Sequence, residues 1–266
     1  MFNNFATLFL VLSAALCGTL AYEFRRLHSD EAAGRNEFPY MAAMLVKNRY
    51  HCNAVIIKPL YILATAACIL HQKDHIKDIR IRTGTDSIYA GGELHEVESY
   101  IIHNVTKDDR DAIGALKLKK SIQFNDRQKS IPVGPVPKEL IDSDPWKIAL
   151  PFAGNWYGTL SGWGKNRAGT DKHFSLRKVD ETIIERFPRC KKFLNDAGLK
   201  YYDHTLCSYV RYAFLGSDGS VLVYNNTLAG LATYADFEVI TNANRPAYAS
   251  AFAYIYKLQD FVNSLV

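Results

Sequence analysis

The sequence predicts an all-β protein made of short antiparallel strands, and three observations carry this prediction. Apolar runs of about four to eight residues recur along the chain and are separated by turn residues. Several of these runs are rich in β-branched residues, which favour strands. The chain has no internal repeat with a period of about 20–50 residues, which argues against a solenoid. Together these features are typical of a β-sandwich or a β-barrel.

The predicted strands of the first half follow one another closely. They cover residues 41–46, 52–57, 61–63, 79–83, 95–102 and 113–118. Lys58 and Pro59 end the second of them, because proline has no N–H to give to a strand ladder. Residues 132–151 contain several prolines and changing charge, so they are predicted to form a crossover between two halves.

The second half is predicted to begin with a strand over residues 156–164, which ends in Ser-Gly-Trp-Gly. Residues 185–197 are predicted to form a short surface helix between two strands. The last residues, 254–266, carry apolar side chains at helical spacing: Ile255, Leu258, Phe261, Val262 and Leu265. This spacing predicts an amphipathic closing helix.

The first 21 residues carry no charged side chain. Residues 5–16 are mainly apolar and small residues follow up to Ala21, which predicts a secretory signal peptide over residues 1–21. The alternative is a membrane anchor, but the run is shorter than the about 20 residues that a span needs. Residues 22–26 would then form a short pro-like segment. Residues 27–266 would form the folded domain, with lobes over about 27–131 and 147–250.

Four cysteines would remain after Cys17 is removed with the signal peptide: Cys52, Cys68, Cys190 and Cys207. Four cysteines allow three pairings, of which the local one is the simplest, Cys52 with Cys68 and Cys190 with Cys207. Each local pair would close a loop of roughly 15 residues and stabilise the fold by about 3 kcal/mol in the chain-entropy model. No Cys-x-x-Cys or paired Cys/His spacing occurs, so neither zinc nor another cofactor is expected.

The net charge of +5 is mild for a chain of 266 residues. Basic side chains are scattered apart from short clusters within residues 117–120 and 189–192, which are interpreted as solvated surface. No nucleic-acid-binding motif occurs, and no segment after the first 21 residues is apolar enough to span a bilayer. We therefore expect neither nucleic acid nor membrane as a partner.

A series of blocks along the chain resembles, in the same order, the trypsin/chymotrypsin family of serine proteases. The blocks are Phe-Pro-Tyr at 38–40, Cys-Asn-Ala-Val-Ile-Ile at 52–57, Tyr-Ile-Leu-Ala-Thr-Ala-Ala-Cys at 61–68, residues 111–118, Ser-Gly-Trp-Gly at 161–164, Gly-Ser-Asp-Gly-Ser-Val-Leu-Val at 216–223, and residues 230–235. The family's blocks matching 52–57 and 216–223 read Cys-Gly-Gly-Ser-Leu-Ile and Gly-Asp-Ser-Gly-Gly-Pro-Leu-Val. The resemblance implies two perpendicular six-stranded antiparallel β-barrels with a C-terminal helix.

The same resemblance implies that the catalytic groups are missing. The family's mechanism needs a hydroxyl nucleophile, an imidazole base and a carboxylate that orients the imidazole. The base position, directly before the second cysteine, holds Ala67. The carboxylate position holds Ala112, with Asp111 one residue early and so on the other face of a strand. The nucleophile position holds Asp218, whose carboxylate would repel a developing oxyanion, and Ser217 before it would point away from the cleft.

Proteolytic activation is also expected to fail. In the family, cleavage after a basic residue frees an ammonium group that pairs with the aspartate before the nucleophile. The matching cleavage here would follow Arg26 and create a terminus at Leu27. Ser217 occupies the partner position, so the buried ion pair would not form, and a buried ammonium without a partner is costly. Whether the chain is cut after Arg26 stays open.

The substrate pocket departs from the family's pattern as well. No cysteine follows Cys207, so the disulfide at the pocket rim is absent. Tyr212 would fill the pocket floor, and Tyr234 with Ala235 replaces the Trp-Gly of the substrate-binding strand. Gly216 remains, so one backbone amide of an oxyanion site would persist, although glycine also suits a turn. A residual cleft would thus contain Tyr212, Gly216 and Tyr234.

A rebuilt triad is the alternative to lost catalysis, because a triad is recognised by geometry and not by order in the sequence. The first half contains candidate histidines at positions 51, 71, 75, 95 and 103, each of which is interpreted as a surface or strand-edge residue. The metalloprotease signature is absent, since His95-Glu96 has no second histidine four positions after the first.

Two N-glycosylation sequons occur, at Asn104 and Asn225, and the second is placed between two strands in a predicted hairpin turn. Our main hypothesis is a secreted, catalytically inactive serine protease homologue of the kind that the resemblance associates with insect haemolymph or seminal fluid. It would bind other secreted proteins, such as active serine proteases, inhibitors or other homologues, as a cofactor, decoy or regulator. The alternatives are a hydrolase with a displaced active site and a peptide-binding module that uses the residual cleft.

Overall fold

The computed structural model describes residues 31–103, 113–136, 157–164, 175–185, 189–210, 219–240 and 246–266. The predicted signal peptide over 1–21 and the pro-like segment over 22–26 lie outside these ranges. Within the described ranges, no helix is long and apolar enough to cross a membrane.

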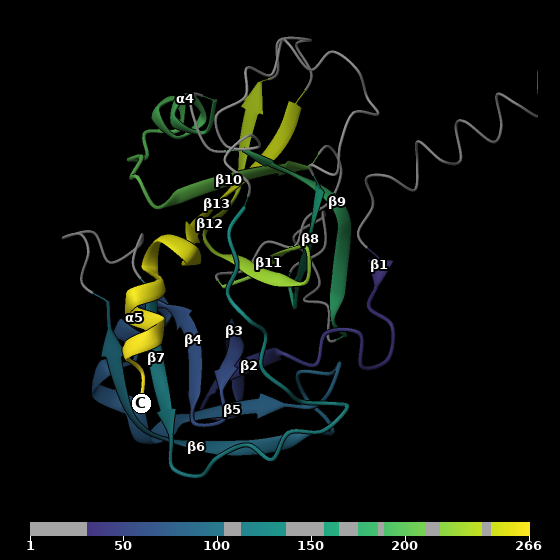
Figure 1. The fold of residues 1–266 in the computed structure, drawn as a ribbon, viewed down its shortest axis with the longest axis vertical. Coiled ribbons are helices and arrows are strands. Elements are labelled where there is room, and N and C mark those ends of the chain that lie inside the picture. Colours follow the sequence, from purple (N-terminus) through teal and green to yellow (C-terminus); the bar gives the residue numbers. More distant parts are fainter. Residues whose placement is uncertain are drawn as a thin grey trace, which may run out of the picture.

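The first half of the chain closes into a six-stranded barrel (Figure 1). Its strands are β2 (Met41–Val46), β3 (Arg49–Lys58), β4 (Tyr61–Thr65), β5 (Ile79–Thr83), β6 (Glu93–Ile102) and β7 (Ile113–Leu118). They follow the order β2-β3-β4-β7-β6-β5, and every neighbouring pair is antiparallel. Closure removes the exposed strand edges that an open sheet would present.

Alternate residues of β4 pack into two different cores. Ile62 and Ala64 belong to the cluster inside the barrel. Tyr61 and Leu63 belong to a second cluster, which also contains Val221 and other residues of the second half. All five residues of β4 are therefore buried, because both of its faces are covered. This explains why β4 is a continuous apolar run in the sequence, whereas β5, with the sequence Ile-Arg-Ile-Arg-Thr, alternates.

The second half forms a seven-stranded sheet. Its strands are β1 (Glu31–Ala32), β8 (Tyr157–Gly162), β9 (Arg177–Glu185), β10 (Thr205–Val210), β11 (Val221–Tyr224), β12 (Thr227–Ile240) and β13 (Pro246–Tyr254). The order is β1-β9-β10-β13-β12-β11-β8, and β8 pairs back onto β9. Six of these strands thus form a ring of pairings, with β1 attached at β9.

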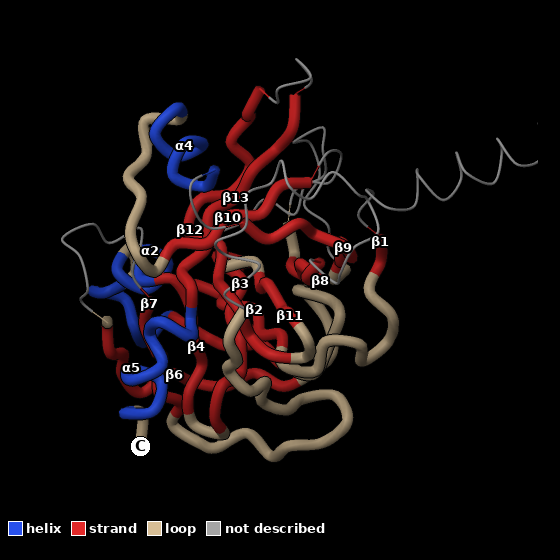
Figure 2. The backbone as a smooth tube through the Cα atoms, turned by 45° about the horizontal axis from the view of Figure 1, so that its top comes forward, coloured by secondary structure: helices blue, strands red, loops and turns tan. Residues whose placement is uncertain are grey.

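The predicted all-β class with a barrel, a second β-structure and a closing helix is confirmed. Figure 2 shows that strands make up most of the described chain and that the helices lie at its periphery. The helices are α2 (Ala66–Leu70), η1 (Lys73–Asp78), α4 (Arg189–Asp196), η3 (Ile255–Leu258) and α5 (Gln259–Ser264). The helix predicted over 185–197 is shorter, because Glu185 still pairs with Cys207 in the sheet. The closing helix likewise begins after Tyr254, which pairs with Gly230.

The C-terminal helix α5 returns to the first barrel and lies beside β4 and β7 (Figure 1). Phe261 and Val262 pack into the core cluster shared by the two halves. The hydroxyl of Tyr61 donates to the carbonyl of Val266 at 2.5 Å, and the ammonium of Lys58 donates to the carbonyl of Leu265. The chain end is thereby tied to the β3–β4 turn.

The N-terminal segment is tied to the second half by a lysine. Lys178 of β9 is mostly buried, and its Nζ lies 2.7 Å from Glu37, 2.9 Å from Asp180 and 3.3 Å from Glu31. Burial alone would lower the pKa of Lys178, but the hydrogen bonds to Glu37 and Asp180 raise it above its ordinary value. The backbone N–H of Ala33 also donates to Leu176, at 2.9 Å.

Candidate functional site

Ala67, at the position expected for the imidazole base, lies in the single-turn helix α2 directly after β4. Thr65 precedes the helix in an extended conformation, and its hydroxyl lies 3.0 Å from Sγ of Cys68 instead of capping the helix. The carbonyl of Ala67 accepts a hydrogen bond from the backbone N–H of His71 at 3.0 Å. Ala67 is half-buried. Its methyl group has no lone pair, so this position supplies no acid–base chemistry.

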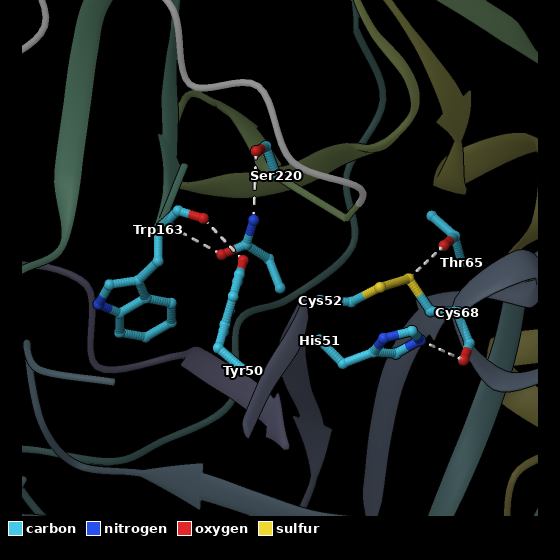
Figure 3. Close-up of a disulfide and its surroundings, with 8 residues drawn as sticks. Tyr50, His51, Cys52, Thr65, Cys68, Trp163 and Ser220 are labelled. Carbon is cyan, nitrogen blue, oxygen red and sulfur yellow. Dashed lines mark hydrogen bonds between the residues drawn. A yellow bond between two sulfur atoms is a disulfide. The ribbon is translucent and has the colours of Figure 1, made fainter. Parts of the chain in front are cut away.

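A disulfide fixes α2 against β3. Cys52 and Cys68 are bonded with their Cα atoms 6.3 Å apart, as the local pairing predicted. The imidazole of His51 lies beside this disulfide, with Nε2 3.2 Å from the carbonyl oxygen of Cys68 (Figure 3). A carbonyl only accepts hydrogen bonds, so Nε2 of His51 carries the proton and donates it. That nitrogen is therefore not placed to take a proton from a nucleophile.

One imidazole and one hydroxyl do lie at the distance of a nucleophile–base pair. Nε2 of His95 is 2.8 Å from Oγ1 of Thr83. However, Thr83 is only 1% exposed, and its hydroxyl donates its proton to Oε1 of Gln128 at 2.6 Å. His95 must then donate to Thr83, and burial lowers the pKa of His95, which keeps it neutral. This pair is a buried structural network and does not present a nucleophile.

The remaining candidate histidines also have structural surroundings. His103 packs on Phe261 of α5, with ring centroids 4.9 Å apart. Burial, and secondly the nearby positive charge of His204, lower the pKa of His103. His75 lies on the surface with Nδ1 3.8 Å from Asp78. Across the described ranges, no group of three or more His, Cys, Asp or Glu side chains is arranged to hold a metal ion.

A buried polar junction joins the two halves and contains Ser220. Asn53 of β3 is fully buried. Its Oδ1 accepts from the backbone N–H of Trp163 at 2.9 Å, and its Nδ2 donates to Oγ of Ser220 at 3.3 Å (Figure 3). Tyr50 donates its hydroxyl to the carbonyl of Trp163 at 2.7 Å. Ser220 lies two residues after Asp218 in the sequence.

Several predicted site residues lie outside the described residues. These are the carboxylate position Ala112, the nucleophile position Asp218, and the cleft residues Tyr212 and Gly216. Tyr234 lies on β12, where it pairs with Ala251 beside two irregularities in the strand register. The assignment of the triad and cleft therefore rests on the sequence blocks, with Ala67 as the described member of the triad and Tyr234 as that of the cleft.

The second disulfide joins Cys190 of α4 to Cys207 of β10, with their Cα atoms 5.4 Å apart. It confirms the other half of the local pairing. Both cysteines are fully buried and pack with Leu194 and Ala251. The disulfide thus holds the short helix α4 on the second sheet, where the helix alone would be too short to be stable.

Asn225 lies at the tip of the β11–β12 hairpin. Asn225 and Asn226 both have positive φ, 47° and 59°, as a two-residue type I′ turn requires. Both side chains are exposed, and Thr227 donates its hydroxyl to the carbonyl of Tyr224 at 2.8 Å. The sequon is therefore accessible in the folded chain. Asn104 lies outside the described residues.

A surface pocket of about 340 Å³ lies on the first barrel. It is lined by Gly84, Gly92, Glu93 and residues 125–128. None of these residues belongs to α2 or to the predicted cleft, so this pocket is separate from Ala67.

The sequence alone did not identify Asn53 and Ser220 as interacting residues. The available signal was a departure from glycine in two of the quoted blocks, at 52–57 and at 216–223. The helix α2 was also not predicted, because Ala-Ala-Cys-Ile-Leu continues the apolar run of β4 without helical periodicity.

Comparison with known proteins agrees with this architecture. The trypsin family model matches residues 28–262. Hypodermin-A of Hypoderma lineatum is 23% identical over 253 residues, which cover 93% of this chain and 90% of that protein. Trypsin epsilon of Drosophila erecta is 25% identical over 239 residues, which cover 86% and 87% of the two chains.

Comparison with solved structures also indicates a trypsin-like fold. The structure of neuropsin, a serine protease expressed in the limbic system of mouse brain, matches with a TM-score of 0.64 at 15% identity. The match covers 88% of this chain and 97% of neuropsin, so the fold is chymotrypsin-like. Because the family model spans both β-structures and most of the C-terminal helix, this chain belongs to the trypsin family.

Proposed function

We propose that this chain is a secreted, catalytically inactive member of the trypsin family that acts by binding other extracellular proteins. The observation that carries the proposal is Ala67, which lies beside the Cys52–Cys68 disulfide where the family's blocks place the imidazole base. Removing that imidazole alone costs a serine protease about 10⁶-fold in turnover. The scaffold around the position is retained while the reactive group is absent.

The other triad positions support the same proposal from the sequence. Ala112 cannot orient an imidazole, and the carboxylate of Asp218 is a poor nucleophile toward an amide. His51 and His95 use Nε2 to donate hydrogen bonds, to Cys68 and Thr83. Nε2 of neither imidazole is therefore placed to take a proton from a nucleophile. These contacts count against a hydrolase with a displaced site.

Secretion is supported by the uncharged N-terminus and by two disulfides. Disulfides persist in oxidising compartments and are rare in the cytosol. A glycan on Asn225 is part of the proposal, because this side chain is exposed at a hairpin tip. Removal of N-glycans with a glycosidase should shift the mass of the secreted protein. Asn225→Asp, which tolerates positive φ, should abolish the shift contributed by this site.

The partners proposed are active trypsin-family proteases, their protein inhibitors, or other homologues. The direct experiment titrates the purified, secreted protein with an active trypsin-family protease and with a protein inhibitor, and measures heat of binding together with the protease rate. We expect a stoichiometric complex with one of them and no hydrolysis of a peptide library by the chain alone. Hydrolysis by the chain itself would contradict the proposal.

The matched control in that titration is the Cys52→Ala/Cys68→Ala variant, which removes the disulfide that fixes α2. Binding through the folded scaffold should weaken in this variant under conditions where it is partly unfolded. Binding that is unchanged when the variant is fully denatured would show nonspecific association.

A further inference from the structure

We infer that Asn53 and Ser220 form a clamp between the two β-structures that holds residues 219–220 in place whether or not the chain is cut after Arg26. The inference rests on the proposed function, because it concerns how a scaffold without an activation ion pair fixes residues 219–220, which follow the nucleophile position in the sequence. It concerns the folded state and can be tested without any assay of catalysis.

The clamp depends on one side chain that satisfies two groups of the opposite half. Asn53 comes from β3 of the first barrel and is fully buried. Its Oδ1 accepts a hydrogen bond, at 2.9 Å, from the backbone N–H of Trp163, which directly follows β8. Its Nδ2 reaches Oγ of Ser220, directly before β11, at 3.3 Å. A buried backbone N–H without a partner is costly, so Trp163 depends on this amide.

The backbone next to Ser220 lies very close to the backbone of Asn53. Gly219 has φ +82°, and a Cβ built on it would lie 2.2 Å from the carbonyl oxygen of Asn53. A Cβ on Gly162 would lie 2.8 Å from Oγ of Ser220 and 3.1 Å from Nδ2 of Asn53. Glycine at position 162 leaves room for the two side chains, and glycine at position 219 lets this segment approach the backbone of Asn53.

The segment is also fixed from the other side by β12. The N–H of Gly219 donates to the carbonyl of Ala232 at 2.8 Å, and the N–H of Ala232 donates to the carbonyl of Ser220 at 2.9 Å. Gly219 follows Asp218 in the sequence, so the clamp and β12 together anchor the end of the segment that carries the nucleophile position.

The two polar residues replace two glycines of the family's blocks. The first glycine after the cysteine of the 52–57 block is Asn53, and the second glycine after the nucleophile position is Ser220. Glycines carry no side chain to form such a bond. Here both positions hold hydrogen-bonding side chains, and the two side chains meet although they are 167 positions apart in the sequence.

The clamp uses groups that are present before any cleavage. Neither Asn53, Ser220 nor Trp163 belongs to the terminus that a cut would create. Residues 31–32 already pair with β9, and the N–H of Ala33 donates to the carbonyl of Leu176. We therefore expect the same geometry at residues 219–220 in the uncut chain and in a chain that begins at Leu27.

The first test is a double-mutant cycle with Asn53→Ala and Ser220→Ala in the secreted full domain. The unfolding equilibrium is measured in urea for the wild type, both single variants and the double variant. We expect the effects to be coupled by at least threefold in the equilibrium constant. The control cycle combines Asn53→Ala with Thr83→Ala. The hydroxyl of Thr83 bonds to His95 and Gln128 and not to Asn53, so the two effects should be additive.

The second test follows amide hydrogen exchange in peptides that span residues 219–233. Ser220→Ala keeps the bond between Asn53 and Trp163, so it should fold even where Asn53→Ala does not. We expect exchange there to be at least about tenfold faster in Ser220→Ala than in wild type. We expect equal protection in the uncleavable Arg26→Gln chain and in the chain that begins at Leu27.

An additive cycle, unchanged exchange in Ser220→Ala, or protection that arises only after cleavage would each overturn the clamp. None of these results depends on whether the chain is catalytic. Hydrolytic activity combined with a coupled cycle would overturn the proposed function and leave the clamp in place.

Discussion

Nε2 of His51 lies 3.2 Å from the carbonyl oxygen of Cys68, one residue after Ala67. The imidazole of His51 is thus bonded to the backbone of the helical turn that contains Ala67. His51→Phe should lower the free energy of unfolding by about 1 kcal/mol, because the carbonyl loses a donor in a half-buried site. Urea denaturation measures this change. His71→Gln on the exposed end of α2 is the control and should change stability by less than about 0.5 kcal/mol.

Both disulfides close short loops, with sequence separations of 16 and 17 between the paired cysteines. Cys52→Ala/Cys68→Ala should lower the free energy of unfolding by about 3 kcal/mol, and Cys190→Ala/Cys207→Ala by a similar amount. Equilibrium unfolding without reductant gives both values. A loss below about 1 kcal/mol in each pair would show that the bonds do not constrain the unfolded chain as the entropy model requires.

Stability should fall as the pH falls below about 6.5. Burial lowers the pKa values of His95 and His103, and for His103 the charge of His204 adds to the effect. The unfolded chain then binds more protons than the folded chain, so the free energy of unfolding rises with pH in the window below the ordinary histidine pKa. Each such group contributes a slope of at most about 1.4 kcal/mol per pH unit.

Thermal unfolding between pH 7.5 and pH 5 measures the dependence on histidine protonation. His103→Gln should flatten it. An equal slope in wild type and in His103→Gln would exclude His103 as a contributor.

Lys178 of β9 pairs with three carboxylates, two of which, Glu31 and Glu37, belong to the N-terminal segment. The contact between this segment and β9 should therefore depend on the positive charge of Lys178. Lys178→Gln should lower the free energy of unfolding by about 1–2 kcal/mol, since it leaves Glu31, Glu37 and Asp180 repelling one another. Lys192→Gln is the control, because its exposed ion pair with Asp196 should contribute little. Loss of stability with rising salt should be larger in wild type than in Lys178→Gln. No difference in salt dependence would contradict this account.

Much of the fold follows from local patterns in the sequence. The bounds of β2, β5 and β7 coincide with the predicted strands, because each is an apolar or alternating run that turn or polar residues delimit. The short helix α2 could not be predicted, because its five residues carry no periodicity and it is held by the disulfide to β3. Tertiary contacts, and not propensity, determine an element of this length.

The candidate site was predictable only in part, for a different reason. Ala67 could be identified because the block around it, including Cys68, resembles that of the family, so the missing histidine is recognisable. The contact between Asn53 and Ser220 joins positions that are far apart in the chain and have no periodic signal. Such a contact depends on how the two β-structures meet, which local patterns do not specify.

The central claim is that this scaffold has lost its nucleophilic chemistry. The most direct measurement is labelling of the purified, secreted protein with a fluorophosphonate, read as covalent mass added per chain by intact mass spectrometry. An active trypsin-family protease serves as the positive control, and the Ala67→His/Ala112→Asp/Asp218→Ser variant tests whether the scaffold accepts the missing groups. We predict no stable adduct on the wild type at any pH from 6 to 9. Stoichiometric labelling of a serine in the wild type would contradict the account.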